Sequence, residues 1–371
     1  MRHADALAAP GAAAERAFRV DGPHELGDDD VDPAAAAMAC TDPGESTMRL
    51  ALMSEPQQGL AYGELLALAR TAEAAGLEAF FRSDHYASFP GDADRPTTDA
   101  WATLAGLARE TQRIRLGVLV SPVTFRLPGP LAKMATTVDE MSGGRLEVGL
   151  GAGWNELEHA QLGIPYPGTR ERFDRLEEAL AIVNGLWTEP DGWTYEGRFW
   201  QVRDAFYRPS PAREGRPRPN LIVGGEGKPR GLRLAARYAD EYNVSSVDAA
   251  GAAAARAGLS RACADLGRDP DRVVFSAMVG VLVGETETEV QDRTRSLLTD
   301  IGAEADPAAA AAYLASRRSR WIIGTPEQAL EAIEVFAAAG VRRLMLQDLL
   351  PRDLAMVRLI GERLLAPGSR I

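Results

Sequence analysis

The sequence predicts a (β/α)8 barrel with insertions, preceded by a disordered N-terminal tail. From Met48 onward, strand-like apolar runs alternate with segments of helical periodicity, a pattern typical of βα units and a parallel sheet. Eight such runs can be counted, and eight repeats favour a closed barrel over an open doubly wound sheet. The length of 371 residues fits one barrel of this type with insertions.

The start of the chain differs in composition from the rest. Residues 1–47 are rich in Ala, Asp, Gly and Pro, include the acidic run of Asp28, Asp29, Asp30 and Asp32, and show no sustained apolar periodicity. Such a segment cannot bury enough apolar surface to fold, so we predict a disordered tail over residues 1–47 and a barrel over residues 48–371. We hypothesise that Met48 is the true translation start; natively expressed protein that began at Met1 would refute this.

The predicted strands share an apolar run that ends in a polar or glycine-rich turn. They are Arg49–Met53, Glu78–Arg82, Ile114–Val120, Arg145–Leu150, Asn220–Val223, Glu241–Val244, Val273–Val283 and Arg342–Gln347. Between them, apolar residues recur at spacings of three and four, which predicts helices. Gly76 and Gly340 are expected to end helices and Thr325-Pro326 to begin one, because glycine favours helix C-termini and proline the first helical turn.

Two segments do not fit a barrel unit. Residues 191–218, rich in Trp, Tyr, Gly, Arg and Pro, predict an insertion with a small hairpin at Trp193–Trp200. A second insertion, largely helical, is predicted from about Ile301 to Arg318. The loop Phe89–Thr98, the segment Trp193–Trp200 and the second insertion are expected to line the substrate entrance.

Composition and charge exclude several classes of function. A net charge of -12 argues against general affinity for nucleic acid or anionic membranes, because both require a basic surface. The two cysteines, Cys40 and Cys263, are far apart and lack CxxC spacing, so neither a disulfide framework nor a thiolate metal site is indicated. We find no membrane-length apolar run and no secretory signal, and therefore expect a cytoplasmic protein that binds no metal.

A carboxylate and an imidazole follow the second predicted strand. Active sites of such barrels are built at the C-terminal ends of the strands, where Asp84 and His85 are expected. His85 could hydrogen-bond a cofactor ring or transfer a proton, because its reference pKa is near neutrality, and Asp84 could accept a hydrogen bond from a cofactor hydroxyl. The alternative is that Asp84 caps a turn and His85 is an ordinary loop histidine.

The third predicted strand is unusually long and ends in a Ser-Pro turn. It contains Leu119 and Val120. One interpretation is an ordinary buried strand followed by a loop. The other is a strained backbone that presses against a planar ring.

Two glycine-rich turns follow the fourth and fifth strands. Their backbone amides could approach a ligand closely, and a helix N-terminus with a nearby lysine after the fifth strand could hold a phosphate. Tight packing without a ligand is the alternative for both turns. His159 is interpreted as a surface residue. The residues concerned are Gly151, Gly153 and Trp154 after the fourth strand, and Gly224, Gly225, Gly227 and Lys228 after the fifth.

In this order and spacing, five segments between Met48 and about Pro367 resemble the luciferase-like monooxygenase superfamily, and within it the F420-dependent oxidoreductases of actinobacteria. The segments are GLEAFFRSDHY, RIRLGVLVSPVTFRLPGPLAKMATTVDEMSGGRLEVGLGAGWNELEHAQLGIPYP, RFDRLEEALAIVNGLW, LIVGGEGKPRGLRLAARYADEYNV and GTPEQALEAIEVFAAAGVRRLMLQ.

The resemblance implies a barrel that binds a deazaflavin or flavin at the C-terminal ends of its strands. It places Asp84 against the cofactor, His85 beside the reactive centre, and a non-proline cis peptide at Leu119-Val120. It also implies that both glycine turns face the cofactor, the later one being the preferred phosphate site. Some F420 dehydrogenases of the family carry a catalytic glutamate where this chain has Trp154, so their acid-base scheme does not transfer.

We therefore expect an F420-dependent oxidoreductase that transfers a hydride between the deazaflavin and a small organic substrate, with His85 handling the proton. The nearest alternative is a two-component monooxygenase that receives reduced FMN from a partner reductase. A non-catalytic flavin carrier and an unrelated phosphate-binding barrel are further alternatives. Related barrels often dimerise, so a homodimer is one option by analogy, and the sequence leaves the oligomeric state open.

Overall fold

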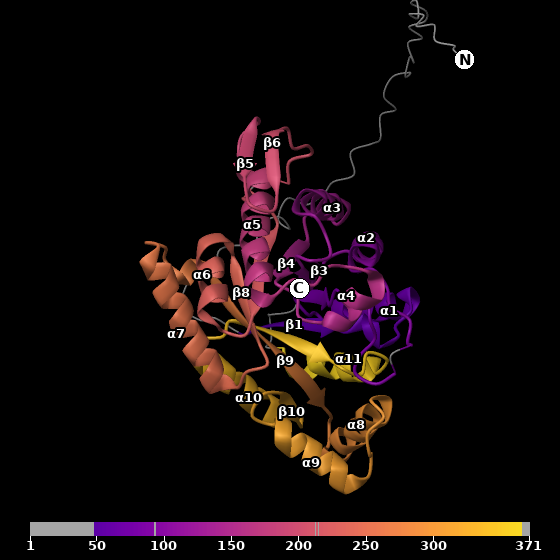
Figure 1. Ribbon diagram of the computed structural model, residues 1–371. Helices are drawn as coiled ribbons and strands as arrows, with labels where there is room; N and C mark the ends of the chain where they lie inside the picture. Colours follow the sequence, from indigo (N-terminus) through magenta and orange to yellow (C-terminus); the bar gives the residue numbers. More distant parts are fainter. Residues whose placement is uncertain (1–47, 93, 212, 214, 366–371) are drawn as a thin grey trace, which may run out of the picture. The chain divides into compact units, whose positions relative to one another are not determined.

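Eight parallel strands close into a barrel surrounded by helices, which confirms the predicted fold (Figure 1). The computed structural model describes residues 48–92, 94–211, 213 and 215–365, so the predicted tail lies outside the described residues. Each predicted strand is present, with its ends shifted by at most two residues. In their order around the barrel, the strands are β1 (Arg49–Ser54), β2 (Ala79–Arg82), β3 (Arg115–Pro122), β4 (Leu146–Gly151), β7 (Asn220–Gly225), β8 (Glu241–Ser245), β9 (Val274–Val283) and β11 (Arg343–Asp348), and β11 pairs with β1 to close the ring.

The helices cover the outside of the barrel (Figure 1). Gly76 and Gly340 adopt positive φ of 83° and 87° after α1 and α10, as predicted for helix ends. The α10 helix begins with a capping box in which the side chain of Gln328 accepts a hydrogen bond from the backbone N–H of Thr325. The helices are η2 (Pro56–Gln58), α1 (Tyr62–Ala74), α2 (Ala100–Glu110), α3 (Pro128–Met141), α4 (Glu156–Leu162), α5 (Thr169–Thr188), α6 (Pro229–Tyr238), α7 (Ala249–Asp265), η3 (Pro270–Arg272), α8 (Glu287–Asp300), α9 (Pro307–Arg317), α10 (Pro326–Ala338) and α11 (Leu354–Arg363).

Both predicted insertions are present, with one correction. The first forms an antiparallel hairpin of β5 (Trp193–Glu196) and β6 (Gln201–Ala205), so the predicted end at Trp200 is wrong. The second contains α9 and is followed by a short strand that the sequence did not predict, β10 (Ile322–Gly324), which pairs in parallel with the end of β9. Within the described chain, none of the helices is both long and apolar enough to cross a lipid bilayer.

Apolar side chains form two layers. The larger lies between the strands and the helices, and it includes the buried free thiol of Cys263. The smaller fills the inside of the barrel; its buried members are Ala51, Met53, Ala79, Phe81, Leu119, Ile222 and Met345. Val120 and Met278 pack on this inner cluster and are only partly buried. They therefore form an apolar surface that is open toward one end of the barrel.

The other end of the barrel interior holds a buried ion cluster. Arg343, at the start of β11, donates to Glu147 at 2.7 and 3.0 Å and to Glu241 at 3.1 Å, and all three side chains are 1% exposed. Arg115 donates to Glu147 at 2.6 Å. Burial alone would raise the pKa of Glu147, but the two arginine charges outweigh it and hold that pKa well below its usual range. Burial raises the pKa of Glu241, although Arg343 opposes the effect.

A second buried carboxyl lies at the end of β11. The side chain of Asp348 accepts a hydrogen bond from the N–H of Leu350 at 2.8 Å through Oδ1, whereas Oδ2 is buried and has no partner among the described residues. Burial raises the pKa of Asp348 to about 7; the Leu350 hydrogen bond opposes this rise and the Asp353 charge adds to it. The folded protein therefore holds a proton that the unfolded chain has already released at pH 5 to 7.

This proton makes stability depend on pH. Its stabilising contribution is fully present below the unfolded pKa of 3.8 and is lost as the pH rises through about 7. We expect Asp348→Asn to gain about 2–3 kcal/mol relative to the wild type between pH 5 and pH 8, because a tenfold change in a protonation equilibrium corresponds to about 1.4 kcal/mol. Urea unfolding of both proteins at the two pH values measures this gain, and parallel pH dependence in the two proteins would contradict it.

Candidate active site

The open end of the barrel is formed by the C-terminal ends of the strands, where the sequence places the site. The predicted non-proline cis peptide Leu119-Val120 is present in β3, and the pairing of β3 with β4 shifts register between Val118 and Ser121. The side chain of Val120 lies against glycines of two neighbouring strands. A Cβ atom would be 2.5 Å from Val120 Cγ2 at Gly151 and 2.9 Å from Cγ1 at Gly224, so both positions need glycine.

Trp154 and His85 lie together at this end. Trp154 is 64% exposed, and its ring centroid is 5.6 Å from that of His85 and 5.3 Å from that of Phe89. The preceding residue, Gly153, has a positive φ of 78° that carries the chain from β4 toward α4. An exposed indole at the barrel mouth can form a side wall for a planar ligand.

His85 is held by a buried carboxylate. Its Nδ1 lies 3.0 and 3.2 Å from the two carboxylate oxygens of Glu158 on α4, and the His85 side chain is 14% exposed. Glu158 is 1% exposed and also accepts from the backbone N–H of Tyr86 at 2.9 Å. The Nε2 atom has no hydrogen-bond partner among the described residues. Sequence reasoning missed Glu158, whose only signal is an acidic residue in the turn after Trp154.

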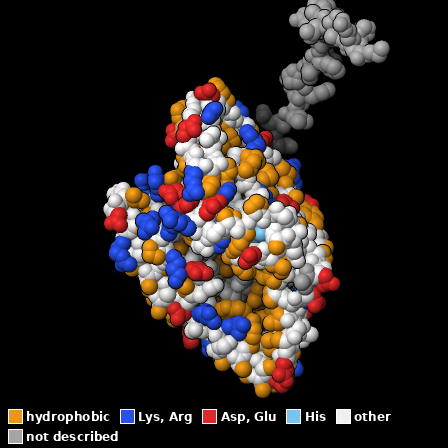
Figure 2. Space-filling model, viewed as in Figure 1, with side chains coloured by type: hydrophobic (Ala, Val, Ile, Leu, Met, Phe, Trp, Pro, Cys, Tyr) orange, Lys and Arg blue, Asp and Glu red, His pale blue; other side chains and the backbone are white. Residues whose placement is uncertain are grey.

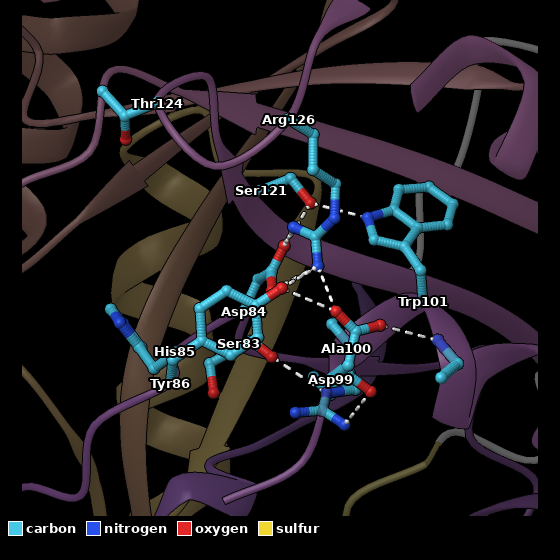
Figure 3. A network of polar contacts seen from close by, with 12 residues as sticks. Ser83, Asp84, His85, Tyr86, Asp99, Ala100, Trp101, Ser121, Thr124 and Arg126 are labelled. Carbon is cyan, nitrogen blue, oxygen red and sulfur yellow. Dashed lines mark hydrogen bonds and ion pairs between the residues drawn. The ribbon is translucent and has the colours of Figure 1, made fainter. Parts of the chain in front are cut away.

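Asp84 belongs to a separate buried network (Figure 3). Its carboxylate, 1% exposed, accepts from Ser121 Oγ at 2.6 Å and from both terminal nitrogens of Arg126, Nη2 at 3.2 Å. Arg126 also donates to Asp99 at 2.6 Å and to the Tyr86 hydroxyl at 2.8 Å. Protein donors therefore contact both oxygens of Asp84, and its contact with a cofactor stays a prediction. Sequence reasoning did not identify Arg126.

The charges in this network stabilise one another. Burial would lower the pKa of Arg126, but Asp84, Tyr86 and Asp99 together outweigh it and the pKa is raised. Burial raises the pKa of Tyr86, and the hydrogen bond that its hydroxyl donates to Asp99 raises it further. In Figure 3, the His85 ring points away from the Arg126 guanidinium. The network thus holds Asp84 and Tyr86, the neighbours of His85 in the chain. None of its polar side chains forms a hydrogen bond with the His85 imidazole.

The interpretation of His159 as a surface residue is wrong. His159 is fully buried, because the first turn of α4 packs against the loop after β3. Its Nδ1 lies 2.6 Å from the backbone oxygen of Asn155 and its Nε2 lies 2.7 Å from the hydroxyl of Thr124. Both ring nitrogens are engaged, so His159 has a structural role at the base of α4.

Internal contacts explain much of the glycine turn after β7. The N–H of Gly227 donates to the hydroxyl of Tyr242 at 2.9 Å, and a Cβ at Gly225 would lie 2.9 Å from the same hydroxyl. Burial raises the pKa of Tyr242 to about 12, so this hydroxyl stays protonated. The predicted phosphate site at this turn is not tested by these contacts, but one of its amides is already used. Basic side chains gather on this side of the molecule in Figure 2. The exposed or partly exposed basic residues of α5, α6 and the turn are Arg170, Arg175, Lys228, Arg230, Arg233 and Arg237.

Two of the three predicted entrance segments border a pocket of about 310 Å³. Arg95 and Pro96 come from the loop after β2, Ile301 begins the late insertion, and Arg352 follows β11. Trp193 of the hairpin lines a separate pocket of about 60 Å³ at the base of its own insertion. Figure 2 shows a hollow near the centre of this face of the molecule.

Among the described residues, no group of three His, Cys, Asp or Glu side chains is placed to hold a metal ion.

Known proteins of similar sequence include an F420-dependent dehydrogenase and an FMNH2-dependent monooxygenase. The chain is 35% identical over 185 residues to an F420-dependent glucose-6-phosphate dehydrogenase of Microbacterium testaceum, a match that covers 49% of this chain and 52% of that protein. The match thus spans about half the length of this relative. An FMNH2-dependent dimethylsulfone monooxygenase of Pseudomonas putida is 27% identical over 250 residues, which cover 58% of this chain and 65% of that protein.

Solved structures support the fold. An F420-dependent secondary alcohol dehydrogenase in complex with an F420-acetone adduct superimposes with a TM-score of 0.73 at 20% identity, over 87% of this chain and 99% of that one. A family model described as luciferase-like monooxygenase matches residues 46–343, which include seven of the eight barrel strands in full and the first residue of β11. The chain belongs to the luciferase-like monooxygenase family.

Proposed function

We propose that the protein is an F420-dependent oxidoreductase that oxidises or reduces a small organic substrate by hydride transfer. One observation carries the proposal: the Nε2 atom of His85 lies at the barrel mouth and has no partner among the described residues, while Nδ1 is anchored to Glu158. When bound, the deazaflavin would supply the hydride chemistry. The protein residues would bind, orient and protonate or deprotonate the substrate.

The residues at the mouth fit a flat ring system. Val120 and Met278 present a partly exposed apolar surface over the inner cluster, and Trp154 stands to one side. Gly151 and Gly224 allow Val120 to lie flush with this surface, because a side chain at either position would collide with it. A planar aromatic ligand gains most from such an apolar floor with an aromatic wall. We therefore place the ring above Leu119-Val120, and its phosphate toward the basic surface near Lys228.

The contact with Glu158 determines which ring nitrogen of His85 carries the hydrogen. A buried carboxylate that already accepts from the Tyr86 N–H is an acceptor, so His85 donates its Nδ1–H to it. The neutral imidazole then carries its lone pair on Nε2, which can accept the proton of a substrate hydroxyl. In the reverse direction, the protonated ring returns that proton.

Binding of the cofactor is the direct test. We expect purified protein to bind F420 at least about tenfold more tightly than FMN, as measured by fluorescence titration of each cofactor. A Trp154→Ala variant should weaken F420 binding, whereas Trp193→Ala, on the distant hairpin, serves as the matched control. Tight FMN binding without F420 binding would overturn the proposal.

The alternative is a two-component monooxygenase that uses FMN. The similarity to the FMNH2-dependent dimethylsulfone monooxygenase favours it, because that match covers a larger share of the relative than the dehydrogenase match does. This function requires a partner reductase to deliver reduced FMN. Oxygen uptake that depends on reduced FMN, with no F420 binding, would establish it.

A further inference from the structure

Four polar side chains meet beside the barrel mouth, at the ends of β11, β1 and β2. Glu55 Oε1 accepts from Gln347 Nε2 at 2.6 Å, and Glu55 Oε2 accepts from Gln57 Nε2 at 2.6 Å. The hydroxyl of Ser83 in turn donates to Gln57 Oε1 at 2.6 Å. We call these four residues the Glu55 cluster. Within it, Glu55 is 6% exposed, Gln57 is 2% exposed and Ser83 is 2% exposed, whereas Gln347 is only partly buried.

The cluster fixes the orientation of the Gln347 amide. Both carboxylate oxygens of Glu55 are acceptors, so Gln347 must turn its nitrogen toward Glu55 and its carbonyl oxygen away. Rotating the amide would bring two oxygens to 2.6 Å without a hydrogen between them. The Oε1 atom of Gln347 has no hydrogen-bond partner among the described residues, and it is not among the fully buried polar atoms that lack one. It is therefore an accessible hydrogen-bond acceptor with a fixed direction.

This acceptor faces the proposed substrate site. Gln347 pairs in register with Met53, and Met345, two residues earlier on β11, belongs to the inner cluster. Since side chains of a strand alternate between faces, Gln347 points to the inside of the barrel. It is the last inward-facing residue of β11, at the same end as Val120 and His85.

We propose that Gln347 binds the substrate through its carbonyl oxygen, and that the substrate carries a second hydrogen-bond donor besides the reacting hydroxyl. The inference rests on the proposed function. A hydroxyl has a single hydrogen, and the reacting one gives it to His85 Nε2. Gln347 lies on β11, which is separated from β2 by β1, so its acceptor must be met by another group of the substrate. Diols, polyols and amino alcohols are the substrate classes that satisfy both positions, and Glu55 is the positioning residue.

The test compares 1,2-propanediol with 2-propanol. F420 reduction is followed with each alcohol, and the ratio of the two kcat/KM values is determined for the wild type and for Gln347→Met, which keeps the length of the side chain but removes the acceptor. We expect the diol preference to fall by about tenfold, the scale of one neutral hydrogen bond. Glu55→Gln should also reduce it, because the 347 amide is then free to rotate. Gln201→Met, an exposed change on the hairpin, should leave the ratio unchanged.

A binding measurement separates this inference from the proposed function. Dissociation constants of the two alcohols are measured by ligand-observed NMR for the wild type and Gln347→Met, with no turnover required. If neither alcohol reduces F420 but the diol binds more tightly and loses this advantage in Gln347→Met, the cofactor assignment falls and the binding role of Gln347 stands. If the wild type shows no diol preference in either measurement, or Gln347→Met retains it, the inference is wrong.

Discussion

Replacing Glu147 by glutamine should lower the free energy of unfolding by about 3–5 kcal/mol, the range for removing one partner of a buried ion pair. Arg343 is fully buried and receives its two shortest carboxylate contacts, 2.7 and 3.0 Å, from Glu147. Without that carboxylate, a guanidinium charge inside the barrel keeps only Glu241 at 3.1 Å and Glu78 at 3.1 Å among the described residues. The measurement is equilibrium urea denaturation at pH 7, monitored by circular dichroism.

Glu241→Gln is the matched control. Glu241 is just as buried as Glu147, but burial raises its pKa and disfavours its charged form, so its loss should cost less than that of Glu147. We expect Glu241→Gln to destabilise the protein by less than about half as much. Equal losses in the two variants would mean that the two carboxylates share the charge of Arg343 evenly. A loss below about 1 kcal/mol for Glu147→Gln would contradict the assignment of a buried, charged pair.

The barrel could be predicted because each of its strands is a local pattern. An apolar run followed by a glycine or polar turn is visible within a short stretch of sequence, and the predicted ends differ from the observed ones by at most two positions. β10 was missed because its three residues are too few to show a pattern of their own. The hairpin end was misplaced because the turn between β5 and β6 contains apolar aromatic residues that resemble a strand.

The site was predicted only in part, because its contacts join residues that are distant in sequence. His85 and Glu158 are 73 residues apart, and Asp84 and Arg126 are 42 residues apart, so no local spacing links them. Asp84 and His85 are neighbours that a sequence pattern treats as one unit. The fold gives their side chains different surroundings: Asp84 points into the ion network with Arg126, whereas His85 points toward the barrel mouth. Similarly, Arg343 and Glu147 lie at the N-terminal ends of their strands, where a charged residue resembles a strand boundary.

Replacing His85 by alanine should lower turnover by about 10² or more while leaving F420 affinity within a few-fold, if its Nε2 accepts the substrate proton. The large effect is expected because among the described residues Nε2 has no partner, and the two aromatic rings that pack against the His85 ring, Trp154 and Phe89, cannot take up a proton. Steady-state reduction of F420 and fluorescence titration of the cofactor measure the two quantities separately. Unchanged turnover would remove His85 from proton transfer.

Two further measurements distinguish proton transfer from a structural role. Added imidazole should restore part of the activity of His85→Ala, because a free base can enter the space of the lost ring, whereas it cannot repair a misfolded loop. Glu158→Gln should give an intermediate loss of about tenfold. A neutral amide still contacts His85 Nδ1, but it can donate its N–H there and move the imidazole proton to Nε2, the atom that must be free. The carboxylate thus acts by selecting the tautomer, and the size of the Glu158→Gln effect measures how strongly catalysis depends on that selection.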